Sequence, residues 1–168
     1  KANNCSDMQF QFHPLTRKEA TELISWRYDR PLDIYNIEVD TNSLQNTVDF
    51  FVDPKNSYFA ISSNLHELTA FCCFGADGQV PGGDYSLDAL DIGLGIRPEL
   101  TGQGLGSPIA IATIDYARQS FSPQRLRVTI AAFNFRALKV WQNLAFVPVQ
   151  RFRKQNGGNE YLVFIRNT

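Results

Sequence analysis

The pattern of hydrophobic and polar residues predicts a series of strands and helices along the chain. Short runs that alternate between apolar and polar residues, or that are apolar throughout, indicate strands, and apolar residues three or four positions apart indicate helices. Strands are expected at 8–13, 58–62, 68–74, 87–96, 125–132, 146–153 and 160–166. Helices are expected at 16–26, 43–52, 104–120 and 134–144.

Local signals support several of these elements. Thr16, followed by Glu19 three residues later, is typical of the capping box of a helix. Pro108 falls in the first turn of the third helix, where a missing amide hydrogen costs little. The run 156–159 has the glycines and asparagines of a hairpin turn, and the short links within 57–96 favour an antiparallel meander. The sequence has no internal repeat and no interdomain linker, so we expect one mixed α/β domain.

Length and charge narrow the class of protein. A chain of 168 residues suits one domain with a sizeable core. Its formal net charge of -1 argues against a dedicated nucleic-acid binder, which would carry a clustered basic excess. No apolar run approaches the roughly 20 residues that span a membrane, and no signal peptide is visible at the start. We therefore expect neither nucleic acid nor membrane as a partner.

The three cysteines favour a reducing compartment. Cys72 and Cys73 are adjacent and do not readily bridge each other within a strand, and the odd count that includes Cys5 leaves one unpaired. Their apolar surroundings favour small buried side chains over a catalytic thiol. His13 and His66 show no ligand spacing with these thiols, so no metal site is expected. A cytoplasmic location follows from this use of cysteine.

The most informative stretch is the glycine-rich run at 92–106. An apolar strand leads there through a turn at Pro98 into a loop, and a helical pattern follows. Gly102, Gly104 and Gly106 let a backbone approach a bulky polar ligand closely, because no Cβ intervenes. The first amides of a helix lack partners inside it and lie at the positive end of its dipole. The run therefore predicts a seat for a pyrophosphate or another anion.

Two common phosphate loops do not fit this run. A P-loop requires a lysine directly after its last glycine, and none follows here. The dinucleotide fingerprint can be placed on Gly102 and Gly104, but Ser107 occupies the position of its third glycine. That fingerprint also opens a repeated βαβ system, and only about 60 residues follow this loop.

Another nucleotide loop does fit. The run from Thr101 to Gly106 resembles the Gln/Arg-x-x-Gly-x-Gly/Ala loop of the GCN5-related N-acetyltransferase (GNAT) family, which follows a strand and opens a helix. A second run, from Asn134 through Trp141 to Phe146, resembles the family pattern Asn-x-Arg-Ala-x-x-x-Tyr-x-x-x-Gly-Phe. The two runs lie about 30 residues apart and are separated by one helix and one strand, as in the family.

The resemblance covers about 8–166 and implies a fold. It predicts an α/β (α+β) domain of GNAT type over 1–168. Its mixed, mostly antiparallel sheet would have six or seven strands, flanked by about four helices, with a splayed central strand pair. The cofactor half would occupy about 85–150, and the helices on the acceptor side about 15–56.

The resemblance also implies acetyl-CoA as the cofactor. Relatives hold its pantetheine arm and acetyl oxygen with the strand before the loop, where a backbone donor at Ile96 would act as an oxyanion hole. The residues expected to bind the cofactor are Leu94, Gly95, Ile96, Thr101, Gly102, Gln103, Gly104, Leu105, Gly106, Ser107, Asn134 and Trp141. Two of these residues have simpler alternative roles. Gly95 could only allow the strand to bend, and Asn134 could be an ordinary helix N-cap.

Two departures from the family pattern affect the chemistry. Thr101 stands where Gln or Arg is common, which removes one side-chain contact to phosphate. Trp141 stands where a Tyr often protonates the departing thiolate, and an indole nitrogen is no practical proton donor. Either solvent, another residue such as Tyr35 or Tyr161, or unassisted departure of the thiolate would replace that tyrosine.

Asp91 is the first candidate for a general base. It lies on the same strand as the acetyl site, a few residues upstream, and some relatives carry a carboxylate there that acts on the amine through water. The alternative is a solvent-facing aspartate that only balances charge. Asp88 and Glu38 are weaker candidates.

The acceptor site is expected in the amino-terminal third of the chain. Trp26, Tyr28 and Tyr35 are the candidate substrate-binding residues, because aromatic faces with nearby carboxylates suit a cationic amine. The alternative is that these aromatics pack a loop onto the sheet. A small amine, a free amino acid and a protein amino terminus all stay open as acceptors.

Two hypotheses follow from these observations. The first is an acetyl-CoA-dependent N-acetyltransferase, acting as a monomer or homodimer by direct attack of a primary amine on the thioester. The second is a catalytically degenerate acyl-CoA-binding or sensor module, which the replacement of Tyr by Trp141 favours. Transfer to a hydroxyl, or of a longer acyl chain, would share the same fold.

Overall fold

The computed structural model describes residues 8–168, so Cys5 lies outside the described residues. Seven strands and four α-helices are present in this part of the chain. The strands are β1 (Gln11–Pro14), β2 (Tyr58–Ser62), β3 (Ala70–Phe74), β4 (Leu90–Ile96), β5 (Arg125–Ala131), β6 (Val147–Arg153) and β7 (Glu160–Asn167). The helices are α1 (Arg17–Ile24), α2 (Leu44–Val52), α3 (Gly106–Phe121) and α4 (Phe135–Asn143).

These elements confirm the predicted series in kind and in order, and the differences lie at the ends. The first strand begins at Gln11 rather than at residue 8. The third helix begins at Gly106 rather than at 104, because Gly104 has a φ of 79°, a left-handed conformation that an α-helix does not contain.

The strands follow one another in the order β1-β2-β3-β4-β5-β7-β6. β1 pairs antiparallel with β2, and β7 pairs antiparallel with both β5 and β6. β4 and β5 are parallel, which requires a long crossover, and this crossover contains α3. The predicted mixed α/β fold, with a mixed sheet of six or seven strands, is therefore confirmed.

The chain is compact in two units. The first comprises the residues up to Cys72 together with Gly95–Leu105, and the second comprises Cys73–Leu94 together with Gly106–Thr168. A boundary between the units therefore falls inside both β3 and β4.

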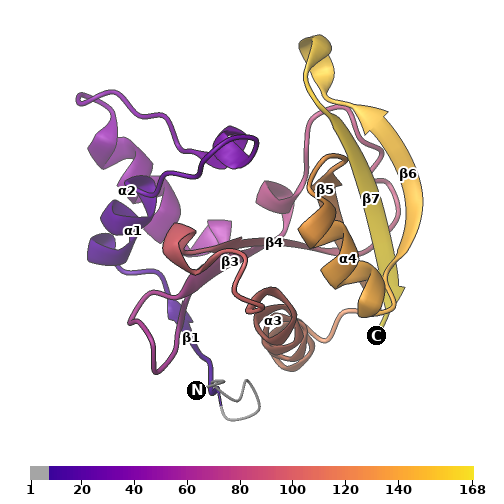
Figure 1. Cartoon of the computed structure of the whole chain (residues 1–168), viewed down its shortest axis with the longest axis horizontal. Coiled ribbons are helices and arrows are strands. Elements are labelled where there is room, and N and C mark those ends of the chain that lie inside the picture. The colour runs from indigo at the N-terminus through magenta and orange to yellow at the C-terminus, as the bar shows by residue number, and fades with distance from the viewer. Residues whose placement is uncertain (1–7) are drawn as a thin grey trace. The chain divides into compact units, whose positions relative to one another are not determined.

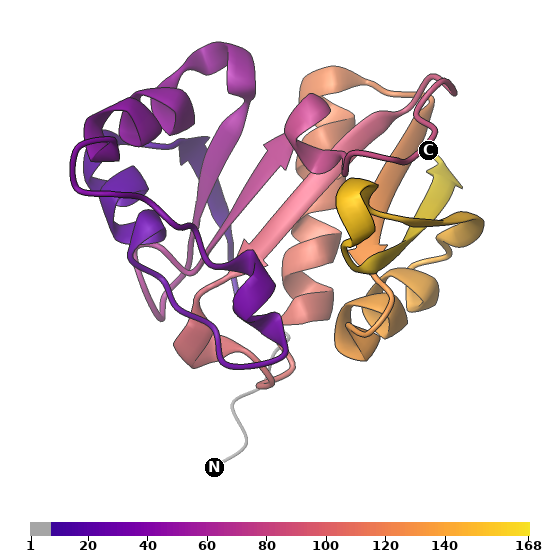
Figure 2. The ribbon, with the colours of Figure 1, turned by 90° about the horizontal axis from the view of Figure 1, so that it is seen from above.

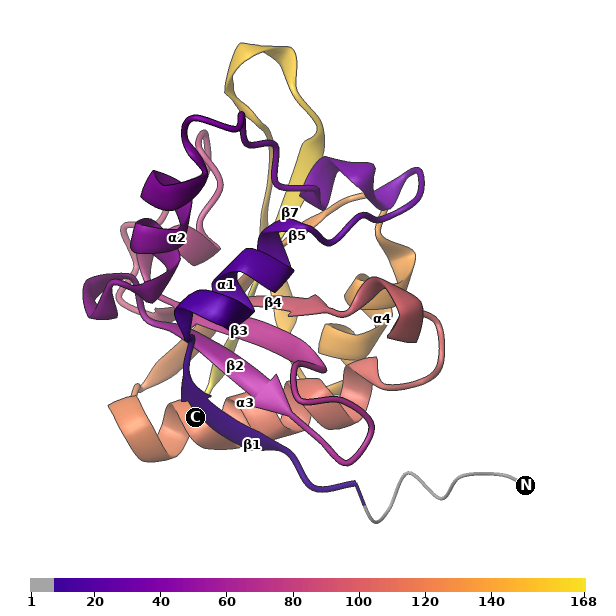
Figure 3. The same cartoon turned by 90° about the vertical axis from the view of Figure 1, so that its left-hand side faces the viewer.

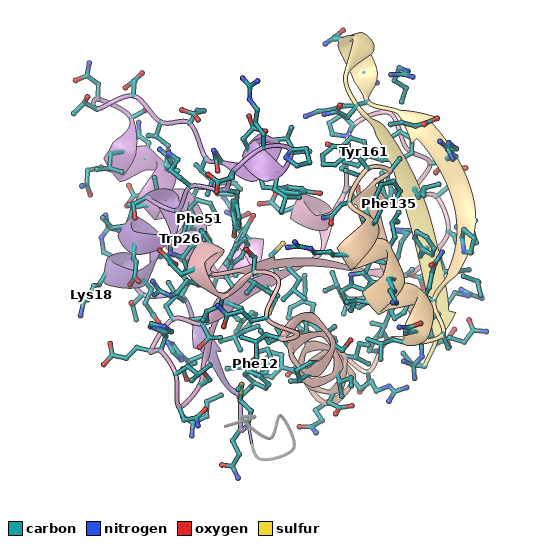
Figure 4. All side chains as sticks on the ribbon, in the orientation of Figure 1. Phe12, Lys18, Trp26, Phe51, Phe135 and Tyr161 are labelled. Atoms are coloured by element: carbon teal, nitrogen blue, oxygen red, sulfur yellow. The ribbon has the colours of Figure 1, made fainter. Side chains whose placement is uncertain are left out.

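In the first unit, α1 and α2 pack on each other (Figure 2), and β1 lies beside β2 (Figure 3). The predicted capping box of α1 is confirmed, since the Thr16 hydroxyl accepts from the Glu19 amide and the Glu19 carboxylate accepts from the Thr16 amide. Trp26 and Phe51 belong to the core of this unit and are labelled in Figure 4. The buried residues of the core are Leu15, Ala20, Leu23, Ile24, Trp26, Val48, Phe51, Ala60 and Leu68.

In the second unit, α3 packs against α4, and β5, β7 and β6 form an antiparallel set (Figure 1). The turn between β6 and β7 closes where the Lys154 amide donates to the Asn159 carbonyl at 2.9 Å. Asn156 and Gly157 have left-handed φ values of 65° and 74° within this turn. The hairpin signal in the sequence is therefore confirmed.

A buried ion pair joins β4 to β5 in the second unit. Asp91 and Arg127 are register partners, and Nε and Nη2 of the arginine donate to Oδ1 and Oδ2 of the aspartate, each at 2.7 Å. Both side chains are only 3% exposed. Gln79 Nε2 also donates to Asp91 Oδ2, at 2.9 Å. The hydrogen bonds from Asp91 are the main reason why the pKa of Arg127 is raised.

The remaining groups of Arg127 hold the loop between β3 and β4. Its Nη1 donates to the Leu87 carbonyl at 2.7 Å, and its guanidinium lies over the Tyr85 ring, 4.9 Å from the centroid. The Tyr85 hydroxyl accepts from the Val80 amide at 2.8 Å and lies 3.0 Å from the Thr129 hydroxyl. One buried arginine thus connects this loop to two strands.

The ion pair marks the limit of pairing between β4 and β5. Their register contains two pairs, Leu90 with Leu126 and Asp91 with Arg127, although both strands continue further. Parallel strands that separate after a short paired segment leave backbone groups of each strand free for a ligand. The splayed strand pair implied by the family resemblance begins at this position.

Side chains of β3 occupy the space above the two glycines of β4. A Cβ on Gly93 would lie 2.6 Å from Cys73 Sγ, and a Cβ on Gly95 would clash with the Phe71 ring. The sequence left open whether these glycines ease a bend or permit a close approach. Within the protein they permit the close approach of a neighbouring side chain, and Cys73 is a buried packing residue as expected.

We expect Arg127→Met to lower the free energy of unfolding by about 3–5 kcal/mol, because it leaves the Asp91 carboxylate buried without its partner. The double variant Asp91→Leu/Arg127→Met should recover most of that loss, since it removes both buried charges. Denaturant unfolding measures both. Arg118→Met is the control, because it removes an exposed, 3.9 Å partner of Asp115 and should cost less than about 1 kcal/mol. Equal losses at the two arginines would contradict this prediction.

We expect Gly95→Ala to destabilise the protein by about 1–3 kcal/mol, because the new methyl group overlaps the Phe71 ring. In a Phe71→Ala background the same substitution should cost much less, since the overlapping ring is absent. Denaturant unfolding of the four proteins of this double-mutant cycle gives the coupling energy. Additive effects of the two substitutions would show that overlap with Phe71 is not the reason why position 95 requires glycine.

Candidate functional site

The loop between β4 and α3 contains two left-handed glycines. A short 3-10 turn at Pro98–Leu100 follows β4, and Gly102 and Gly104 then have φ values of 74° and 79°. L-residues other than glycine rarely adopt these angles. A Cβ on Gly104 would meet nothing within 4 Å, so open space lies where its side chain would be.

The polar side chains of this loop bond within the loop itself. The Thr101 hydroxyl donates to the Pro98 carbonyl at 2.7 Å, and Gln103 Nε2 donates to the Glu99 carbonyl at 2.8 Å. Leu105 is buried. The loop therefore presents backbone rather than side chains to a ligand.

Two glycine amides of this segment have no acceptor within residues 8–168. The Thr101 amide donates to the Pro98 carbonyl at 3.2 Å, but the amides of Gly102 and Gly104 donate to no backbone or side-chain acceptor in this part of the chain. The amides in the first turn of α3, from Gly106, have no partners inside the helix. A Cβ on Gly106 would approach Val140 of α4 to 3.2 Å, which favours glycine there as well. Donor amides at the positive end of a 16-residue helix suit a pyrophosphate in geometry and charge.

The end of β4 carries the residues expected at the acetyl group. Leu94, Gly95 and Ile96 are the last three residues of the strand and are all partly exposed. The Ile96 carbonyl accepts a hydrogen bond from the Tyr28 hydroxyl at 2.6 Å. Sequence reasoning missed this contact, because nothing in the sequence links residues that are 68 positions apart.

The contacts of Asp91 favour a structural role over the base role expected from the sequence. The side chain is buried, and both oxygens accept hydrogen bonds from Arg127 or Gln79. The carboxylate is therefore engaged in holding β4 against β5. Sequence reasoning missed Arg127, although a charged residue inside an apolar strand is a signal for a buried partner.

The second family run forms α4 and the turn before it. Asn134 is the N-cap of α4, and its side chain accepts from the Ala137 amide at 3.3 Å. This confirms the capping role and leaves contact with pantetheine as a prediction. Trp141 is 5% exposed, and its ring packs edge-on against Phe146 with centroids 5.0 Å apart. The indole therefore belongs to the core of the second unit.

The expected substitutes for the family tyrosine differ in exposure. Tyr161, labelled in Figure 4, is 8% exposed, and burial raises its pKa. A phenol with a raised pKa is a poor proton donor at neutral pH. Tyr35 is 41% exposed, on the short 3-10 turn Leu32–Tyr35.

The three aromatic residues expected at the acceptor have different environments. Trp26 is a core residue, with its ring 6.0 Å from Phe71 and the Arg97 guanidinium 5.4 Å from its centroid. Its Nε1 is buried without a hydrogen-bond partner among the described residues. Tyr28 is half-buried and contacts β4, and Tyr35 is exposed. Packing thus accounts for the position of Trp26, while the substrate-binding role of Tyr28 and Tyr35 stays a prediction.

The part of the chain that the structure describes lacks a metal-binding cluster and a membrane-spanning helix. It contains no group of three or more His, Cys, Asp or Glu side chains placed to hold a metal ion. None of its helices is both long enough and apolar enough to cross a membrane.

Solved structures share this fold at low sequence identity. An acetyltransferase of the GNAT family from Bacillus anthracis is 15% identical, with a TM-score of 0.70 over 94% of each chain. A chimera of the spermidine N-acetyltransferase SpeG from Vibrio cholerae with hSSAT is 13% identical, with a TM-score of 0.71 over 95% of each chain. An acetyltransferase structure from Salmonella typhimurium, with its cofactor acetyl-CoA, is 14% identical, with a TM-score of 0.66 over 95% of this chain and 93% of that chain.

Sequence comparison identifies the family. No curated protein matches the chain in sequence. The model of the acetyltransferase (GNAT) family matches residues 19–146, a range that includes the glycine loop and α4. The family resemblance and its acyl donor, acetyl-CoA, are therefore as the sequence predicted, and the chain belongs to the GNAT acetyltransferase family.

Proposed function

We propose that this protein transfers the acetyl group of acetyl-CoA to a primary amine by direct attack on the thioester. The observation that carries the proposal is the loop of left-handed glycines, whose unpartnered amides lead directly into α3. The family match over residues 19–146 supports this proposal.

The chain's backbone would hold the nucleotide end of the donor. Amides of Gly102, Gly104 and Gly106 would bind the pyrophosphate, and Gln103, Leu105 and Ser107 would shape the loop. The hydroxyl and the amide of Thr101 both donate to the Pro98 carbonyl, so Thr101 would support the shape of the loop. Asn134 would reach the pantetheine arm with the amide group that also caps α4. Trp141 would support this helix from the core.

The reaction needs little from side chains because a thioester is already activated. The amine nitrogen attacks the carbonyl carbon, a C–N bond forms, the C–S bond breaks, and sulfur leaves as the CoA thiolate while the amine loses a proton to solvent. The Ile96 amide would donate to the oxygen that gains charge, a role typically worth about 10²–10³ in rate. We assign Asp91 to the support of β4, because its carboxylate is committed to Arg127.

The acceptor we propose is a small cationic amine. The first unit contains 11 acidic and 7 basic residues and the second contains 6 and 9, which together give the net charge of -1. The segment between α1 and α2, which carries Tyr28 and Tyr35, is part of the acidic unit. An acidic surface attracts cationic amines. The SpeG-based structure, named for spermidine, supports the same class.

One observation favours the alternative of a non-catalytic acyl-CoA sensor. Trp141 fills core space where the family tyrosine would donate a proton, and the buried Tyr161 does not replace it. A sensor would bind acetyl-CoA and free CoA with similar affinity and would acetylate no amine. Steady-state assays by thiol release, over a panel of amines, separate the two functions.

We expect acetyl-CoA to bind with a micromolar dissociation constant, and Gly104→Val to weaken binding at least tenfold. The added side chain would both strain a φ of 79° and fill the open space of the loop. Gly157→Val is a matched control, since Gly157 has a φ of 74° and equally open surroundings in the turn between β6 and β7. Calorimetry with each variant tests this. Equal affinity losses in the two variants would attribute the effect to folding instead of to the loop.

We expect kcat/KM to be higher for polyamines than for uncharged amines of similar size, and to fall as salt is raised from 0.05 to about 0.5 M, because screening weakens attraction to the acidic unit. Thiol release measured at fixed, saturating acetyl-CoA tests this. A preference for neutral or acidic acceptors that salt does not change would contradict a cationic substrate, while leaving acetyl transfer itself intact.

A further inference from the structure

The Tyr28 hydroxyl is a hydrogen-bond donor to the end of β4. It donates to the Ile96 carbonyl at 2.6 Å, and both residues belong to the first unit. Burial raises the pKa of Tyr28, and the charge of Glu99 raises it further. The phenol therefore stays protonated across the neutral range, which suits it to holding an acceptor atom in place by a hydrogen bond.

The peptide that follows Ile96 is held at both of its polar atoms. Its carbonyl accepts from Tyr28, and its amide, which belongs to Arg97, donates to the Thr69 carbonyl at 2.9 Å. The preceding residue is Gly95, whose backbone angles no side chain restricts. Gly95 therefore restricts the direction of the Ile96 amide little. The hydrogen-bonded peptide group between Ile96 and Arg97 restricts it more.

The side chain of Arg97 adds to this anchoring. Its Nε donates to the Leu68 carbonyl at 2.8 Å, its Nη2 pairs with the Glu22 carboxylate, and its guanidinium lies over the Trp26 ring. This side chain is only 15% exposed. Tyr28 is thus a contact by which the segment between α1 and α2 joins a strand end that is also anchored through Arg97.

Tyr28 is itself held by the segment that carries the expected acceptor residues. Its amide donates to Asn36 Oδ1 at 2.7 Å, and the Asn36 amide donates to the Asp33 carbonyl at 3.1 Å. These bonds close the loop 28–36, which also contains Tyr35. The Tyr28 hydroxyl therefore connects this closed loop to the strand residue expected to bind the acetyl oxygen.

We propose that Tyr28 is a positioning residue for acetyl transfer. Its hydroxyl fixes the Ile96 peptide so that the Ile96 amide is aimed at the acetyl oxygen, and it holds loop 28–36 in register with that site. Tyr28 acts through the backbone of Ile96 and exchanges no proton. This inference rests on the proposed function and adds a residue that the glycine loop and α4 do not include.

Tyr28→Phe tests this role, because it removes the hydroxyl and keeps the ring. We expect kcat to fall about tenfold while KM for acetyl-CoA stays within about twofold, since the pyrophosphate loop is unchanged. By calorimetry, the preference of the protein for acetyl-CoA over free CoA should also shrink. Tyr116→Phe, which removes a hydroxyl from half-buried Tyr116 on α3, is the control and should change neither quantity.

A second variant guards against loss of folding. Asn36→Ala removes the side chain that holds the Tyr28 amide and leaves the hydroxyl in place, so we expect a smaller change in kcat in the same direction. Thermal unfolding shows which variants are folded. If Tyr28→Phe is not folded, the kcat of Asn36→Ala tests the positioning role instead.

The outcomes separate this inference from the proposed function. A wild-type protein that binds and uses acetyl-CoA, with folded Tyr28→Phe or Asn36→Ala variants equal to it in kcat and in acetyl preference, would overturn the positioning role alone. A wild-type protein that binds neither acetyl-CoA nor CoA would overturn the proposed function and this inference with it. A fall in kcat without a change in KM supports both.

Discussion

The ion pair between Asp91 and Arg127 fixes the point at which two parallel strands separate. Removing two charges from water is costly, and the attraction between them offsets that cost only when the geometry is good and the remaining hydrogen-bonding groups are satisfied. Here both conditions hold, with two 2.7 Å bonds and further partners in Gln79, Leu87 and Tyr85. A slip of register by one residue would bury both charges unpaired, so β4 and β5 can pair in only one way.

This constraint also determines what the rest of β4 can do. Beyond Asp91 the strand has no register partner in β5, and its glycines let side chains of β3 pack directly on its backbone. The strand is thereby held from the β3 side, through Cys73 at Gly93 and Phe71 at Gly95, and its other edge is left to a ligand. Rigid support on one edge with free hydrogen-bonding groups on the other is what recognition of an extended, amide-containing arm requires.

Features set by short-range physics could be predicted from the sequence. The capping box of Thr16 and Glu19, the N-cap role of Asn134 and the glycine loop all depend on residues a few positions apart. Features set by packing could not. The partner of Asp91 is 36 residues away, and whether Trp141 faces a ligand or the core depends on Phe146 and its surroundings. The sequence pattern thus identifies Asp91 and Trp141 as unusual residues, but their contacts are determined by the tertiary structure.

The environments of the aromatic residues argue for catalysis by positioning. Trp141 is in the core, burial raises the pKa values of both Tyr28 and Tyr161, and Asp91 is bound to Arg127. Packing and hydrogen bonds thus account for the positions of all four side chains. A thioester needs little from side chains, because its thiolate leaves readily and its carbonyl needs only an oriented donor. The reaction thus depends mainly on backbone groups of β4. Residues distant in sequence, such as Arg127 and Tyr28, hold this strand in place.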